Sequence, residues 1–586
     1  MACASIPAAK QRALDLPEIM AQIGRHLTRN SLHACIQVSR AWHAFFISLI
    51  WRSLTLSAYT FVRKPSPDTL AKHAHLIRSL DFNGPVQAIY YAIGCRNLES
   101  LSMAGERASW NTHHYTSDYE KPGLRDQDPI TGLVNVNPGL KRLTVVGVNP
   151  PPALEFWEAV CRMTQLESLS VSGLDIAARL MPVFWRAISF RTSELLLDRV
   201  TFLAGDQDKH ANHGGMVSSD MQLDHSLPTQ QHHDPPGTRQ HEFIHLQKLS
   251  LFKLLGSGSG QQTMILENAP RLTTLVWKGD LTFEFPLLSF NKCLSVGRLS
   301  HLKSLDLRGG DAKLADDDLR LILGVMSRLE KLMVPNSGMA SKAMNQLFRH
   351  AHTVEALDIS GCAGVHSNMI QSILSSFPLL KVFVADKISV QDIMDGDPWI
   401  CKGLRELKID IELGYATMDT EAETDLEADG GLWITERSNF DSGSGSGSGL
   451  RRHQKHTTEG AIQRFERDER QQVVFERLSG LKSLEELNII QLKDRPSPTI
   501  EQLTVGMVPK ILDLRLINGL DLLRNLRRLR CFYFAGPQEL SEIDVHWMME
   551  HWKALSHISG QLNSDPTVNK ELAALFRAHR VFVYGW

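Results

Sequence analysis

Apolar residues return along most of the chain in one short phrase, Leu-x-x-Leu-x-apolar, with polar residues at the positions between them. Within the phrase, apolar and polar positions alternate, which is the pattern of a strand with one buried face. After Leu332 the second apolar anchor recurs at intervals of 25, 26 and 24 residues. The anchors are Leu101, Leu143, Leu169, Leu249, Leu275, Leu305, Leu332, Leu357, Phe383, Leu407, Leu487 and Leu529, with a weaker copy at Leu195.

Stretches with helical spacing lie between these phrases, for example residues 315–326 and 368–377. One strand and one helix in so short a unit cannot bury their apolar faces alone, so neighbouring units must stack. The pattern therefore predicts an α/β fold, a repeat solenoid with a strand and a helix in each repeat of about 26 residues.

Polar stretches interrupt the period and divide the chain. We predict repeats over residues 70–411, with polar inserts near 106–138 and 204–242, and a flexible acidic, Gly/Ser-rich and charged insert over 412–472. Residues 473–586 are expected to hold the last repeats, because Leu555 and Val581 keep the step of 26 from Leu529. The expected cap over the open end consists of Trp547, Trp552, Phe576, Tyr584 and Trp586.

Residues 10–56 have a different pattern, that of three short amphipathic helices followed by a strand start. Asp15 is placed to cap the first helix, with Pro17 in its opening turn and Glu18 three residues after the cap. The segment carries more apolar side chains than so small a unit can bury alone. It is therefore either a docking surface or a helical cap on the repeats.

The segment resembles an F-box. Its Leu-Pro opening, the apolar positions of the first two helices, a Val-x-x-x-Trp and a final Trp-x-x-Leu follow that family's order. The matching residues are Leu16, Pro17, Ile19, Ile23, Leu27, Leu32, Val38, Trp42 and Trp51. Ser360-Gly361-Cys362 is similar to the cysteine-containing leucine-rich repeats that commonly follow an F-box.

The resemblance implies a non-catalytic substrate-recognition subunit of an SCF-type, cullin-based ubiquitin ligase. The matching residues would then dock on a Skp-type adaptor, and through it on a cullin, while the repeats bind an unknown protein substrate. The alternative is a leucine-rich-repeat scaffold with no link to ubiquitin. Candidate substrate contacts, by strand geometry alone, are Ser102, Ser170, Ser250, Asp306 and Asp358.

Composition adds few constraints. The formal net charge of -2 gives no indication of a nucleic acid or an anionic membrane as a partner. No apolar run is long enough to span a membrane, and the N-terminus lacks the apolar core of a secretory signal. Eight scattered cysteines favour reduced thiols, so we expect an intracellular protein of the cytoplasm, the nucleus or both.

No motif for catalysis or for a cofactor stands out. Histidines gather around residues 210–245, but only His210-x-x-His213 has a spacing like that of a metal site, and we expect no metal or cofactor. No Cys-x-x-Cys pair and no phosphate-binding glycine loop is present in the sequence. His350 and His352 end a repeat helix, where we expect them to be solvated.

Overall fold

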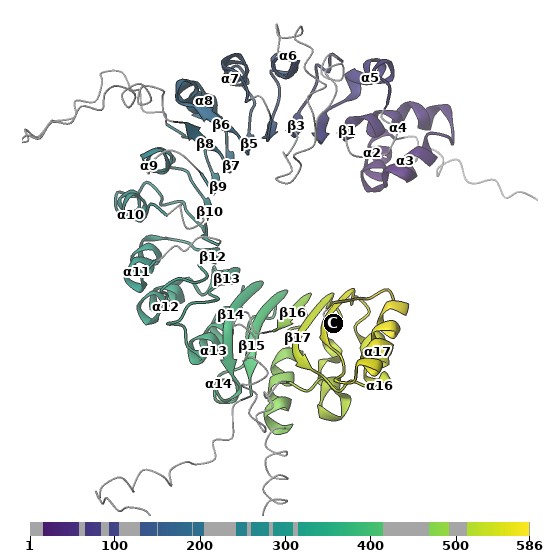
Figure 1. Ribbon diagram of the computed structural model, residues 1–586, viewed down its shortest axis with the longest axis vertical. Coiled ribbons are helices and arrows are strands. Elements are labelled where there is room, and N and C mark those ends of the chain that lie inside the picture. Colours follow the sequence, from purple (N-terminus) through teal and green to yellow (C-terminus); the bar gives the residue numbers. More distant parts are fainter. Residues whose placement is uncertain are drawn as a thin grey trace, which may run out of the picture. The chain divides into compact units, whose positions relative to one another are not determined.

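The computed structural model describes residues 16–57, 65–83, 93–104, 129–148, 151–189, 191–203, 242–254, 260–279, 285–308, 314–413, 468–490 and 512–584 (Figure 1). These residues form two compact units, one ending at Asp311 and the other beginning at Ala312, and each is described by itself. In each unit, parallel strands line one face and helices cover the other (Figure 1).

The first unit contains a parallel sheet with one leucine of each strand in the same row. Its strands are β1 (Ser53–Ser57), β2 (Ser79–Asn83), β3 (Ser100–Ala104), β4 (Arg142–Val146), β5 (Ser168–Ser172), β7 (Glu194–Asp198), β9 (Lys248–Phe252), β10 (Thr274–Lys278) and β11 (Ser304–Asp306). Leu54 pairs with Leu80, and the row continues through each predicted anchor to Leu305, including the weaker copy at Leu195. The predicted period is confirmed, and the repeats begin at β1, earlier than predicted.

Short helices cover the other face of this sheet because each presents apolar residues to the strands. They are α5 (Pro67–His73), α6 (Pro129–Asn135), α7 (Leu154–Cys161), α8 (Met181–Ser189), α9 (Gly260–Glu267) and α10 (Leu287–Ser295). Phe156, Trp157 and Phe184 are fully buried and pack edge to face. A small second sheet joins β6 (Asp175–Ala177) to β8 (Thr201–Leu203).

The polar insert predicted near 106–138 overlaps a helix and a turn of the repeat at its end. Residues 105–128 lie outside the described residues, but α6 and the turn after it belong to the repeat. Asn137 is 1% exposed; its amide donates to the backbone oxygens of Cys95 and Leu133 and accepts from the backbone of Leu98. A buried asparagine satisfied in this way holds two successive repeats together, which the polar composition of the stretch had obscured.

The second unit continues the same architecture with β12 (Lys331–Met333), β13 (Ala356–Asp358), β14 (Val382–Ser389), β15 (Glu406–Glu412), β16 (Glu486–Ile489), β17 (Cys531–Pro537), β18 (His557–Gln561) and β19 (Phe582–Tyr584). Its helices are α11 (Asp316–Val325), α12 (Ser341–Leu347), α13 (Ser367–Ser376), α14 (Val390–Asp395), residues 468–479, α16 (Glu542–His551) and α17 (Pro566–Ala578). Helices predicted over 315–326 and 368–377 are confirmed as α11 and α13.

The predicted register is wrong in the last repeats. Leu487 pairs with Phe532, three residues beyond the predicted anchor Leu529. The phrase Leu-x-x-Leu-x-apolar can begin at Leu526 or, with Phe532 as its second anchor, at Leu529. The structure uses the second register, in which Phe532 and Phe534 bury their side chains in the strand. The two expected closing repeats are present as β18 and β19.

The expected aromatic cap is formed only in part. Trp552 and Phe576 are buried, whereas Tyr584 is 52% exposed because it lies on the outer face of β19. Trp586 lies outside the described residues.

The Ser-Gly-Cys phrase forms a tight turn between repeats. Gly361 has φ +72°, a conformation that favours glycine. Cys362 is 2% exposed, lies 3.2 Å from the Ser337 hydroxyl and donates to the backbone oxygen of Val334. Gly364 lies so close to the preceding repeat that an added Cβ would be 2.7 Å from the Met339 oxygen.

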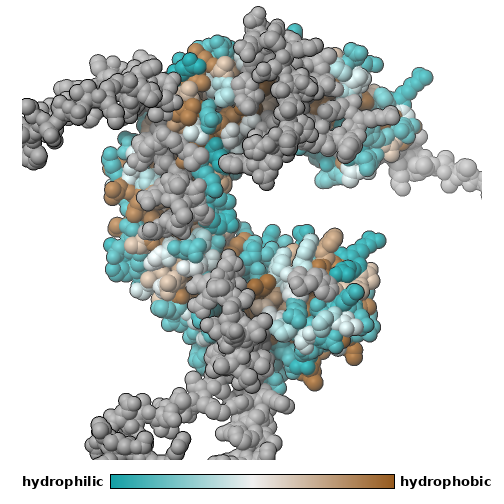
Figure 2. Space-filling view, in the orientation of Figure 1, coloured by the Kyte–Doolittle hydropathy of each residue, from teal (hydrophilic) through white to brown (hydrophobic). Residues whose placement is uncertain are grey.

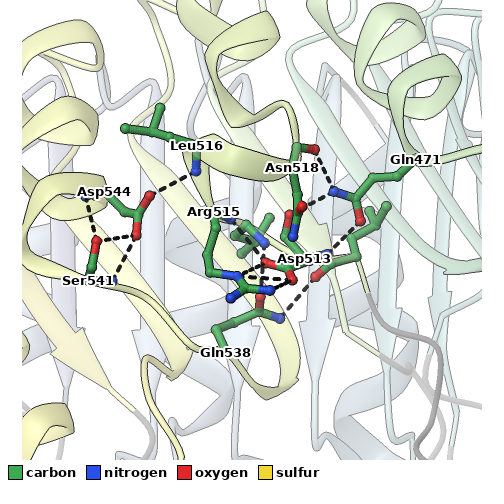
Figure 3. A network of polar contacts seen from close by, with 10 residues as sticks. Gln471, Asp513, Arg515, Leu516, Asn518, Gln538, Ser541 and Asp544 are labelled. Carbon is green, nitrogen blue, oxygen red and sulfur yellow. Dashed lines mark hydrogen bonds and ion pairs between the residues drawn. The ribbon is translucent and has the colours of Figure 1, made fainter. Parts of the chain in front are cut away.

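A polar network attaches residues 512–518 to the elements on either side (Figure 3). Gln471 is 2% exposed; its amide donates to the oxygens of Asp513 and Asn518 at 2.9 and 2.7 Å and accepts from the Asp513 amide at 2.8 Å. On the other side, Gln538 accepts from the amide of Leu514 and Asp544 from that of Leu516.

Gln471 was predicted to lie in the flexible insert, and this boundary is corrected. Residues 414–467 lie outside the described residues, but the helix over 468–479 is part of the repeat.

The expectation that His350 is solvated is also wrong: it is 6% exposed, and its Nε2 lies 3.0 Å from the backbone oxygen of Leu323. His352 is exposed.

Candidate docking surface

Three helices precede the first strand and enclose a small core of their own. They are α2 (Pro17–His26), α3 (Arg29–Cys35) and α4 (Arg40–Arg52). Thr28 and Ser39 cap the second and third helices through their side-chain oxygens. Met20, Leu32, Phe46 and Ile50 are buried together between the helices.

The apolar surface of this helical unit exceeds what its core encloses. Leu16 is 49% exposed, Ile19 37% and Val38 64%, and Pro17 is exposed beside the first two. Single exposed apolar side chains are common on protein surfaces, but here Leu16, Pro17 and Ile19 gather at one helix start. The start of α2 and the turn before α4 therefore form the best candidate docking surface of the first unit.

The structure separates the residues of the F-box resemblance into two groups. Leu32 is buried in the core of the helical unit, where its change would disturb the fold, and Ile23, Leu27, Trp42 and Trp51 are half-buried. Leu16, Pro17, Ile19 and Val38 are exposed and remain available for docking.

The first helix does not begin at the predicted cap residue. Leu16 occupies the position before the first helical residue, and no side chain caps it; Asp15 lies outside the described residues. Leu16 has extended backbone angles at this end of the helix, and its side chain is exposed.

The helical unit is joined directly to the solenoid. Helix α4 ends at Arg52 and β1 begins at the next residue, and the Arg52 oxygen accepts from the amide of Arg78 at 2.9 Å. The ring of Trp51 stacks on His73 of α5 with 4.5 Å between centroids. These contacts fix the helices relative to the first repeats, as a docking element needs if it is to hold a partner in a set orientation.

The strand faces offer a second surface, but several predicted contact residues are not accessible. Ser250, Asp306 and Asp358 are 5%, 1% and 7% exposed. The Asp306 carboxylate is bound by the Arg308 guanidinium, with its closest contact at 2.8 Å. Ser102 and Ser170 are half-buried in the middle of their strands. Much of the visible described surface is hydrophilic, and its apolar patches are scattered (Figure 2).

Two deeply buried cysteines have a raised pKa. Burial raises the pKa of Cys95 and of Cys401 to about 11, so both are protonated thiols at neutral pH. Among the described residues, no group of three or more His, Cys, Asp or Glu side chains is arranged to hold a metal ion. His210 and His213 lie outside those residues, whereas His245 is exposed.

A shallow hollow of about 120 Å³ lies between α12 and α13, and no titratable side chain lines it.

The solved structures to which this chain is similar include the following three. An internalin from Listeria monocytogenes str. 4b F2365 matches with 13% identity and TM-score 0.32, over 70% of this chain and 94% of that one. The Rad7 and Elc1 complex from yeast matches with 13% identity and TM-score 0.29, over 54% and 76%. The Toll–Spatzle complex of Drosophila matches with 10% identity and TM-score 0.25, over 63% and 56%.

No protein-family model and no curated protein matches the sequence. At these TM-scores the solved structures add no argument about function. The fold assignment therefore rests on the paired strands and helices of the chain itself. Within the part of the chain described, no helix has the length and apolar character needed to cross a bilayer.

Proposed function

We propose that the chain is a non-catalytic substrate-recognition subunit of an SCF-type ubiquitin ligase. The helical unit over α2–α4 would dock on a Skp-type adaptor, and the repeats would hold a protein substrate. The observation that carries the proposal is the exposure of Leu16, Ile19 and Val38, three positions of the F-box resemblance that the core of the helical unit leaves uncovered.

The mechanism implied is proximity. A protein that holds a substrate near a ubiquitin-charged enzyme raises their effective concentration without forming or breaking a bond itself. The direct connection from α4 to β1 supports this role, because a rigid connection limits the positions that a bound substrate can take.

Adaptor co-purification tests the proposal. Replacing Leu16 and Val38 by alanine removes exposed apolar side chains and leaves the buried core intact, so adaptor binding should be lost with little change in melting temperature. The matched control replaces Leu288 and Val296, which are 87% and 63% exposed in and just after α10. If the first double variant binds the adaptor as well as the control does, the docking assignment is wrong.

The alternative is a repeat scaffold with no link to ubiquitin. In that case the unchanged chain recovers no Skp-type adaptor or cullin from cells, and both double variants recover the same set of proteins. Point variants suit this comparison better than deletion of the N-terminal segment, because a deletion that reaches β1 removes the first strand of the sheet.

A further inference from the structure

The second unit has a strongly basic edge where its last strands begin. In the described loops that enter β15 to β19 the cations outnumber the carboxylates, which are Asp397 and Glu485. We call the exposed cations of these loops the basic rim; they are Lys402, Arg405, Lys482, Arg527, Arg528, Arg530, Lys553 and Arg580.

The cations of the basic rim lack the ion pairs that equivalent loops contain elsewhere in the unit. Arg328 lies 3.0 Å from Glu330, and Lys381 lies 2.6 Å from Glu355 in the neighbouring repeat. Within the described part of the second unit, no member of the basic rim makes an ion pair. Within the described residues, the charges of these cations are therefore not neutralised by an ion pair.

Backbone hydrogen bonds hold part of the basic rim in one row. The Glu485 amide donates to the Arg405 oxygen and the Arg530 amide to the Glu485 oxygen, both at 2.7 Å, and the Ser556 amide donates to the Arg530 oxygen at 2.9 Å. Adjacent strands are about 4.8 Å apart, so Arg405 and Arg530 lie within about 10 Å of each other along the row. Glu485 lies between the two arginines, so the row keeps a net positive charge that a bound anion would neutralise.

Exposed rings stand at the end of the same row. His557 stacks on Phe582 with 5.4 Å between centroids and on Tyr584 with 6.0 Å. Phe582 is 61% exposed, and its amide donates to the Ser556 oxygen, one strand beyond Arg530. We call these three residues the aromatic end.

We propose that the basic rim and the aromatic end together bind a protein segment in which Asp or Glu side chains adjoin an aromatic or large apolar residue. Arginine forms paired hydrogen bonds with carboxylates, and the rim contains more arginines than lysines. The rings supply apolar and stacking contacts for the neighbouring side chain. This interaction is additional to the proposed adaptor docking and does not depend on it.

The surroundings favour a short acidic protein segment over a nucleic acid. Glu406 directly follows Arg405 of the rim, Glu486 occupies the equivalent position on β16, and both contact Lys408, at 2.7 and 3.0 Å. These carboxylates would oppose a continuous polyanion along the strand face. The rings also lie at one end of the row, whereas single-stranded nucleic acid binds to aromatic side chains distributed along its path.

Binding of a short synthetic acidic peptide with one central phenylalanine tests the proposal. Three probes accompany it: the same peptide with alanine at the centre, the same peptide with Asn and Gln in place of the acids, and a single-stranded oligonucleotide. The acidic phenylalanine peptide should bind best, and its affinity should fall as salt is raised.

Charge reversal then assigns the contact. Arg528→Glu with Arg530→Glu should weaken acidic-peptide binding by about tenfold or more at low salt. The matched control, Arg349→Glu with Lys570→Glu, makes the same charge change at exposed positions outside the rim loops and should leave binding within about twofold.

Removal of the rings tests the second contact. Phe582→Ala with Tyr584→Ala should weaken binding of the phenylalanine peptide about threefold to tenfold and leave the alanine peptide unchanged. Equal binding of the amide peptide would overturn the proposal, as would equal losses in the rim variant and its control. An oligonucleotide that binds more tightly than the peptide and is lost in the rim variant would assign the surface to nucleic acid instead.

Discussion

Gln471→Met is expected to loosen the segment over residues 512–518. Methionine keeps the length and apolar character of the buried side chain but cannot replace the three hydrogen bonds of the amide, which are 2.7–2.9 Å long. A buried hydrogen bond contributes about 1 kcal/mol net, and the half-exposed partners on Asp513 and Asn518 regain part of this from water. We therefore expect a loss of about 2 kcal/mol in the free energy of unfolding of the second unit.

The assay is urea unfolding followed by circular dichroism, together with hydrogen exchange. The amide of Asp513, which donates to Gln471, should exchange faster in the variant. Gln472→Met is the matched control, because Gln472 is the next residue on the same helix and is exposed, so its stability should change by less than about 0.5 kcal/mol. If both variants unfold at the same urea concentration, the amide of Gln471 does not hold the segment and the reasoning is refuted.

Three further changes should alter the stability of the second unit. Gly364→Ala should cost about 1–3 kcal/mol in thermal or urea unfolding, because its Cβ would be forced against the Met339 oxygen, whereas Gly403→Ala meets no atom within 4 Å and should be neutral. Folding raises the pKa of the Cys401 thiol from 9.0 to about 11. Its contribution to the free energy of unfolding is therefore complete below pH 9 and is lost as the pH rises to 11. In Cys401→Ala, the free energy of unfolding measured by urea titration should fall less steeply over this pH range. Trp399→Phe removes the indole donor to a buried amide oxygen on α13 and should cost about 1–3 kcal/mol by the same assay.

The repeat period was predictable because it is a property of backbone pairing. Each strand must place one apolar side chain in the same row, and that residue is visible in the sequence from Leu101 to Leu487, as leucine at every anchor except Phe383. The prediction was wrong where two registers carry equally apolar residues, as at Leu529 and Phe532. The choice between them depends on which side chains the neighbouring strand and helix can bury, and one phrase does not contain that information.

The polar residues that hold repeats together were not recognised. Asn137 and Gln471 lie in stretches whose composition indicates a loop, and their burial depends on backbone groups of other repeats. The exposed part of the candidate docking surface was recognised only as a set that also included core residues such as Leu32. Spacing on a helix shows which residues share a face, but it does not separate the residues that form the core from those at its margin.

The two edges of the second unit's sheet differ in a way that bears on the basic rim. The long stretches outside the described residues, 414–467 and 491–511, each follow the C-terminal end of a strand, β15 and β16. The loops that enter the strands are short and closed by backbone hydrogen bonds, such as those from Leu484 to Leu481 and from Leu529 to Leu526. At the edge where the strands begin, short bonded loops hold the backbone of the arginines in place, so a partner that binds there has only their side chains to order.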